Sequence, residues 1–144
     1  MAKSEQVDKH LNQANHNYAF LCKVEENLPE SFYDWKITVT YYIALHLIRA
    51  LGEHLGITLP QNHSSIIREI DPEKNGKLTV NRGCHAVFKS LYNASWDARY
   101  SGYLSPENRK KYLISRYQKA KKGLEIIKNY VVYRGLPENC LEVE

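Results

Sequence analysis

The chain has 144 residues, of which 43% are hydrophobic and 25% are charged, and its formal net charge at pH 7 is +4. These values are typical of one soluble globular domain and exclude a disordered chain. The sequence has no run of about 18 apolar residues and no apolar segment at its start, so we expect neither a membrane span nor a secretory signal. The cysteines form no C-x-x-C pair, which predicts neither a zinc site nor a disulfide framework and favours a cytoplasmic location.

The first half of the chain predicts two long helices. Apolar residues recur at three- and four-residue steps from about residue 4 to residue 28, and Pro29 ends this segment. A second helix is expected from about residue 32 to residue 55, with Ser31 as its cap. Residues 37–51 are apolar almost all round. This helix should therefore be covered on more than one side, as the central helix of a bundle or by a second subunit.

The second half predicts one short and two long helices. The short helix follows Asn62-His63-Ser64-Ser65, which resembles a helix cap, and the long helices cover about residues 81–100 and 106–133. The predicted fold is all-α, an up-and-down four-helix bundle with a short extra helix after the second long helix. We expect the bundle to span residues 1–135 and the C-terminal tail, residues 136–144, to fray.

The third long helix carries two stripes. One is apolar and should face the core. The second recurs at steps of four and three residues and is called here the aromatic–cationic seam: His85, Lys89, Tyr92, Trp96, Arg99 and Tyr103. Aromatic rings can stack on bases and cations can contact phosphates, which predicts a surface for nucleotides or nucleic acid. A homodimer face, in which Trp96 would be central, is the interpretation that we favour for the seam, and cover over a neighbouring helix is the third.

The fourth long helix is rich in lysine and arginine, and its basic patch comprises Arg116, Lys119, Lys121 and Lys122. Its cations are spread around the circumference, which is typical of a solvated face. Their positive field could still attract a polyanion.

Motifs for catalysis, metals or cofactors are sparse. We find no glycine-rich phosphate loop, no G-x-S-x-G and no H-E-x-x-H, and we predict no metal and no cofactor. His46 lies in an apolar run and is interpreted as a core histidine. Arg49 and His54 could hold a phosphate and move a proton in a metal-independent ribonuclease. They lie about 140° apart on an ideal helix, so they could share one phosphate only if the helix ended near Gly52 or a second subunit supplied one of them. We therefore predict no catalysis.

Several of these segments resemble the HEPN domain family. The run Tyr41-Tyr42-Ile-Ala-Leu-His-Leu-Ile-Arg-Ala-Leu is similar to the family's second helix, followed by Gly56 and His63. Leu91-Tyr-Asn-Ala-Ser-Trp-Asp-Ala-Arg-Tyr100 resembles the family's L…R..ADY signature, with Leu91, Ala98 and Tyr100 in place. Ser95 stands where that signature has Arg, and Arg99 where it has Asp. The resemblance extends from about residue 5 to residue 133.

The resemblance implies a helical bundle that forms a homodimer. Family members occur in toxin–antitoxin pairs, phage defence and RNA processing, with a nucleotidyltransferase or an antitoxin as partner. Active members are ribonucleases with an R-x4-6-H motif at the dimer interface. Arg49 and His54 have that spacing but lie earlier in the fold than the family's motif. The leading hypothesis is a non-catalytic homodimer that binds a nucleotide, nucleic acid or protein, and the alternative is a ribonuclease toxin that uses this pair.

Overall fold

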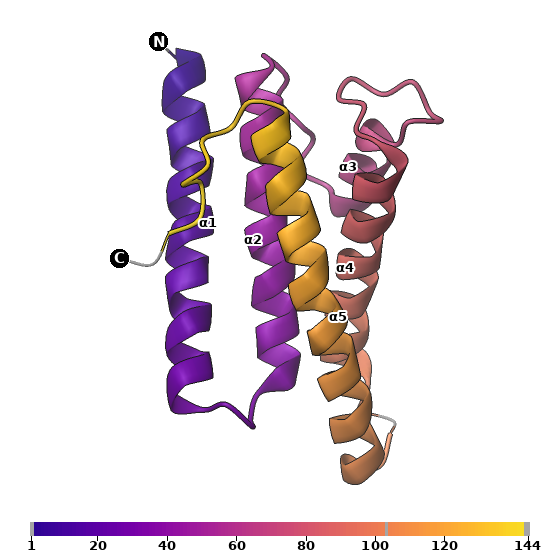
Figure 1. Cartoon of the computed structure of the whole chain (residues 1–144). Coiled ribbons are helices and arrows are strands. Elements are labelled where there is room, and N and C mark those ends of the chain that lie inside the picture. The colour runs from indigo at the N-terminus through magenta and orange to yellow at the C-terminus, as the bar shows by residue number, and fades with distance from the viewer. Residues whose placement is uncertain (1, 103, 143–144) are drawn as a thin grey trace.

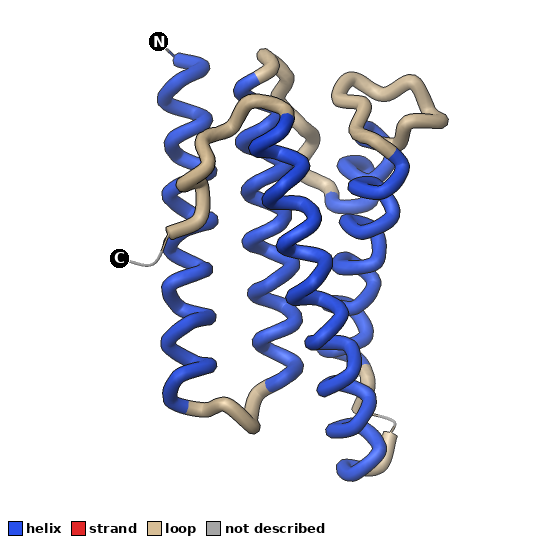
Figure 2. Tube along the Cα trace, viewed as in Figure 1, coloured by secondary structure: helices blue, strands red, loops and turns tan. Residues whose placement is uncertain are grey.

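The computed structural model describes residues 2–102 and 104–142 (Figure 1). It contains the helices α1 (Ala2–Asn27), α2 (Tyr33–His54), α3 (His63–Ile70), α4 (Arg82–Tyr100) and α5 (Pro106–Tyr133). Figure 2 shows only helices and loops along this part of the chain, which confirms the all-α prediction. None of the described helices is both long enough and apolar enough to span a bilayer.

Helix α2 is the centre of the fold. Helices α1, α4 and α5 each pack against it, α4 also packs against α5, and the short α3 packs against α4. Figure 1 shows α1 on one side of α2, with α4 and α5 on the other, and successive long helices run in opposite directions. Among the described helices α1 packs only against α2. In a closed ring of four helices each helix would have two neighbours, so this bundle is open on the side of α2 between α1 and α4.

The burial of the α2 side chains shows which face of the helix lies on the open side. From Lys36 to Gly52 every side chain is buried except Val39, Tyr42, His46 and Arg49, which are half-buried. These four residues, called here the α2 strip, follow one another at steps of three and four residues and so share one face of the helix. The prediction of a central helix covered on more than one side is therefore confirmed, and the strip is the part of α2 that its neighbours leave uncovered.

Side-chain caps begin three of the helices, and the cap at Asn62 is one that the sequence predicts. The side chains of Asn62, Asn81 and Ser105 accept hydrogen bonds from backbone N–H groups in the first turns of α3, α4 and α5. Each cap satisfies a donor that has no partner within its helix.

The predicted Ser31 cap of α2 is wrong. The capping position is held by Phe32, which has a left-handed φ of 57° and no side-chain cap bond. The turn is tied instead by Lys36, whose side chain is only 1% exposed and whose Nζ donates to the carbonyl oxygens of Leu28 at 2.7 Å and Pro29 at 3.2 Å. Its charge is paired with Glu25 at 3.3 Å. A buried ammonium thus satisfies the carbonyls at the end of α1, and the turn is built around it.

The expectation that the chain frays after residue 135 is also wrong for residues 136–142. Leu136 and Cys140 are buried. Asn15 of α1 donates to the Cys140 carbonyl at 2.9 Å and accepts from the Glu142 N–H at 2.6 Å. Figure 1 shows this yellow segment crossing from the end of α5 to α1. Apolar side chains and a bidentate asparagine therefore fasten the segment to a helix that has one helical neighbour.

We expect Asn15→Ala to lower the free energy of unfolding by about 1–3 kcal/mol, because it removes two hydrogen bonds to the tail. Urea titration followed by circular dichroism measures the change. Asn17→Ala is the matched control, since this asparagine is on the same helix and accepts only from Gln13. Equal effects of the two substitutions would contradict the role assigned to Asn15.

Candidate functional site

The aromatic–cationic seam on α4 does not form one continuous surface. His85 is half-buried, and its Nε2 donates to the Ile67 carbonyl at 3.1 Å, so it belongs to the packing of α3 on α4. Tyr92 is half-buried against the rings of Tyr41 and His63, at centroid distances of 5.6 and 5.9 Å. His85 therefore fits the alternative interpretation of the seam as cover over a neighbouring helix, and Tyr92 fits it in part. Tyr103 lies outside the described residues.

The remaining members of the seam, Lys89, Trp96 and Arg99, are exposed. The Trp96 side chain is 47% exposed and its ring lies 4.1 Å from that of Tyr100, centroid to centroid. The Arg99 guanidinium lies 5.9 Å from the Tyr100 ring. An exposed pair of large aromatic rings beside a cation is typical of a binding surface, because the rings offer apolar area at low entropic cost.

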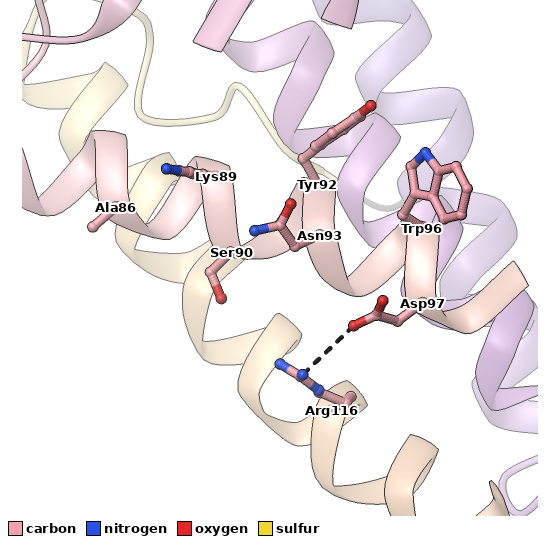
Figure 3. A pocket seen from close by; sticks show the side chains of 8 residues that line it. All are labelled: Ala86, Lys89, Ser90, Tyr92, Asn93, Trp96, Asp97 and Arg116. Atoms are coloured by element: carbon pink, nitrogen blue, oxygen red, sulfur yellow. Dashed lines mark ion pairs between the residues drawn. The ribbon is translucent and has the colours of Figure 1, made fainter. Parts of the chain in front are cut away.

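A shallow hollow beside this surface joins the seam to the basic patch. It has a volume of about 730 Å³ and is lined from α4 by Lys89, Asn93, Trp96 and Asp97, among others, and from α5 by Arg116. Figure 3 shows these side chains around the hollow, with Arg116 turned toward Asp97, to which it is ion-paired at 3.6 Å. This α4 hollow thus offers two cations, one carboxylate, an amide and an indole ring.

The basic patch on α5 is divided between two grooves. Arg116, Lys119 and Lys122 line a narrow groove of about 190 Å³ between α4 and α5, next to the α4 hollow. Lys121 lies over the ring of Tyr117 at 4.8 Å and lines a different groove, between α1 and α5. Three of the four predicted cations therefore extend the α4 hollow, and the fourth does not.

Arg49 and His54 do not come together within one chain. Helix α2 continues through Gly52 to His54, so it does not end between the two residues. Arg49 donates to the carbonyl oxygens of Leu59 and Gln61 at 3.4 and 3.5 Å. His54 lies instead against Gly135, where an added Cβ would be 2.7 Å from its Nε2. The two side chains therefore serve different sides of α2, as the predicted divergence requires.

The sequence analysis missed a pocket that contains Arg49. His10 of α1 and His46 of α2 face each other with 3.1 Å between their Nδ1 atoms, and their rings stack at 5.4 Å. They line a cavity of about 400 Å³, called here the His–Arg pocket, whose polar residues include Lys9, His10, His46, Arg49, Glu53 and Gln61. The interpretation of His46 as a core histidine is wrong, because the residue is half-buried and open to this cavity.

Both histidines of this pair are neutral at pH 7. Burial lowers the pKa of His46 to about 4, and the neighbouring His10 and Arg49 act in the same direction. Burial also lowers the pKa of His10, with a further contribution from Arg49. No motif within one helix could have shown the pair, because its members are 36 residues apart and meet only through the packing of α1 on α2.

A second histidine lies beside the α2 strip. The Tyr41 hydroxyl is 2.6 Å from His63 Nδ1, and the rings of Tyr42 and Tyr92 lie within 6.0 Å of the His63 ring. Burial lowers the pKa of His63, and the charges of Arg49 and Arg99 add to this effect. Burial also raises the pKa of Tyr41. Tyr41 and His63 carried the resemblance in the sequence, and here they pack the start of α3 against α2.

The fold and these sites define the class of protein: an all-helical domain whose surface hollows are lined by aromatic and positively charged side chains. Within the described residues, no three side chains of His, Cys, Asp or Glu converge as metal ligands would. The chain belongs to the HEPN family, since the family model described as HEPN domain matches residues 7–131. The chain has no significant match among curated proteins or among solved structures.

The low pKa of His46 predicts a specific dependence of stability on pH. The folded protein binds fewer protons at His46 than the unfolded chain does. The contribution of neutral His46 to the free energy of unfolding is therefore complete above about pH 6.5 and is lost as the pH falls toward 4. We expect His46→Gln to lose less free energy of unfolding than the wild type over this interval. Urea titrations across the interval measure the difference, and an NMR pKa near 6.5 for His46 would contradict it.

Proposed function

We propose that this HEPN protein is a non-catalytic homodimer that binds single-stranded RNA through the α4 hollow. The observation that carries the proposal is the grouping of Trp96, Asn93, Lys89 and Arg116 around one hollow. Membership of the HEPN family supports it, since the family is generally associated with nucleotides and RNA. The cytoplasmic location remains a prediction from the cysteine pattern, and a nucleotidyltransferase or antitoxin as a partner remains a prediction from the resemblance.

Each side chain of the hollow suits one part of a nucleic-acid strand. The exposed Trp96 ring is a platform on which a base can stack, which contributes about 1–3 kcal/mol per base. Lys89 and Arg116 are placed to contact phosphates, and Lys119 and Lys122 continue the cationic surface along α5. The Asn93 amide can donate to and accept from base edges. Asp97 opposes binding, but its charge is partly balanced by Arg116 at 3.6 Å.

The absence of catalysis in this proposal rests on the separation of Arg49 from His54. A ribonuclease that used this pair would need one residue from each subunit, because α2 is continuous between them. His54 is half-buried against Gly135, where it covers the end of the core. The proposal therefore assigns binding and not cleavage to this protein.

The dimer in this proposal forms through the open side of α2. Trp35 precedes the α2 strip by one helical step and is 56% exposed, and Phe20 on α1 is also exposed. With Val39 and Tyr42 they add apolar area next to the α1–α2 turn, and α1 packs against no other helix that could cover it. A second copy of the chain would cover this area with the same residues across a two-fold axis.

We expect a fluorescein-labelled single-stranded RNA to bind with an affinity that falls by about 0.7 log units per log unit of salt for each phosphate contact. Lys89→Gln should weaken binding and reduce this slope, and Trp96→Ala should weaken binding through lost stacking. Fluorescence anisotropy at a series of salt concentrations measures both effects.

Arg82→Gln is the control for the RNA experiment, because Arg82 lies at the exposed start of the same helix and pairs with Glu73. Arg82→Gln should leave the affinity for RNA within about twofold of the wild type, because it removes only one distant positive charge from the protein's overall field. The same RNA should remain intact in EDTA. Cleavage that Arg49→Ala and His54→Ala both abolish would establish the ribonuclease instead, and no binding at about 50 mM salt would end the RNA proposal.

Trp35→Ala should dissociate the dimer, because a buried interface tryptophan typically contributes roughly 2 kcal/mol or more. Sedimentation velocity measures the change in association. Tyr133→Ala is the control, since Tyr133 is 83% exposed at the end of α5. Trp96→Ala distinguishes the seam as an RNA-binding surface from the seam as a dimer face. If the seam binds RNA, the variant should remain a dimer. A wild-type protein that is monomeric at tens of micromolar would contradict the dimer.

A further inference from the structure

The His–Arg pocket is separate from the α4 hollow, and no residue lines both. Its walls come from α1, α2 and the loop that follows α2. About 400 Å³ is enough for a small ligand. His10, His46, Arg49 and Glu53 are half-buried in its lining, and exposed side chains such as Lys9 and Gln61 form its rim. We propose that this pocket binds a phosphate-type oxyanion, with Arg49 as the anchoring cation and His10 and His46 as its neighbours.

Arg49 is the reason for choosing an anion. Its guanidinium is half-buried, remains charged at every physiological pH, and donates only two long hydrogen bonds to carbonyl oxygens, at 3.4 and 3.5 Å. Among residues 2–102 and 104–142 no carboxylate lies within ion-pair distance of it. A half-buried guanidinium with free donors matches the geometry of an oxyanion, which can accept from it in a bidentate manner.

The other charges around the pocket agree with this choice. Lys9 adds a second positive charge from α1. Among the described lining residues Glu53 is the one opposing carboxylate; its Oε1 accepts a hydrogen bond from Thr58 at 2.9 Å but keeps its charge, so the lining carries two cations against one anion. A metal ion bridging His10 and His46 is the competing occupant. Only two imidazoles are available to it, and Arg49 and Lys9 would repel it.

The histidine pair can respond to the anion by taking up a proton. One imidazole must donate and the other accept across the 3.1 Å between their Nδ1 atoms. One added proton is compatible with this bond, whereas a second proton would leave two donors facing each other. An anion beside the pair would raise the affinity for that first proton, opposing the burial and the Arg49 charge that keep both rings neutral. Binding should therefore be tighter at low pH.

The test uses isothermal titration calorimetry on the full chain after exhaustive dialysis into a buffer without phosphate. Pyrophosphate is the probe for affinity. Sulfate is the probe for pH dependence, because its own charge does not change between about pH 5 and pH 8. We expect sulfate to bind more tightly at the lower pH, with uptake of about one proton per anion in buffers of different ionisation enthalpy.

The variants separate the pocket from general surface charge. Arg49→Gln should weaken pyrophosphate binding about tenfold or more, as expected for a charge-assisted bidentate contact. Arg68→Gln on α3, an exposed arginine, is the matched control and should have little effect. His10→Gln and His46→Gln should each remove the proton uptake, whereas His16→Gln, an exposed histidine of α1, should not. Thermal melts establish that each variant is folded.

Two further measurements identify the source of the phosphate group and the ligand that occupies the His–Arg pocket. A 5′-phosphorylated oligonucleotide that binds Arg49-dependently, while its 5′-hydroxyl form does not, would identify a nucleic-acid end as the source of the phosphate. Binding of pyrophosphate alone would identify a free anion. Trp96→Ala should leave pyrophosphate binding unchanged, so failure of the RNA proposal does not affect this test. Pyrophosphate binding that Arg49→Gln does not weaken, no heat from either anion at low pH, or binding of Zn²⁺ in place of the anions would overturn the proposal.

Discussion

The burial of α2 is the constraint on which the rest of the structure depends. A helix that is apolar almost all round must be covered on several sides, and three long helices pack against it. The positions of α1, α4 and α5 follow from this requirement. Three helices do not enclose the whole circumference, and the α2 strip is what remains. Both the proposed dimer face and the His–Arg pocket lie along this strip, because it is the part of the core helix that ligands and other chains can reach.

Two sets of polar contacts hold α1 in addition to its packing against α2. At one end, buried Lys36 binds the Leu28 and Pro29 carbonyls and pairs with Glu25. At the middle of α1, Asn15 holds the segment that crosses from α5. A helix with a single helical neighbour would otherwise be free to slide or splay. The position of α1 also determines where His10 meets His46, so these contacts support the geometry of the pocket as well as the fold.

The sequence predicts those features that depend on local chemistry. Periodicity located the four long helices, and Asn62 predicted the start of α3, because a cap bond joins residues only a few positions apart. Ser31 failed as a cap because the α1–α2 turn is controlled by Lys36, five residues further on. The fastening of residues 136–142 and the His10–His46 pair could not be predicted, since both depend on the register between segments far apart in the chain. The pattern of a single helix carries no information about that register.

The two sites differ in how strongly solvent screens their charges. Lys89, Lys119 and Lys122 are exposed, so dissolved ions weaken their attraction for a phosphate over roughly 10 Å at 0.1 M ionic strength. Arg49 is half-buried beside two neutral imidazoles, where fewer ions and less water can intervene. An anion in the His–Arg pocket should therefore lose less affinity with salt than a strand across the α4 hollow. Because no residue lines both the pocket and the hollow, the two proposals predict separate salt dependences for a small anion and for a nucleic-acid strand.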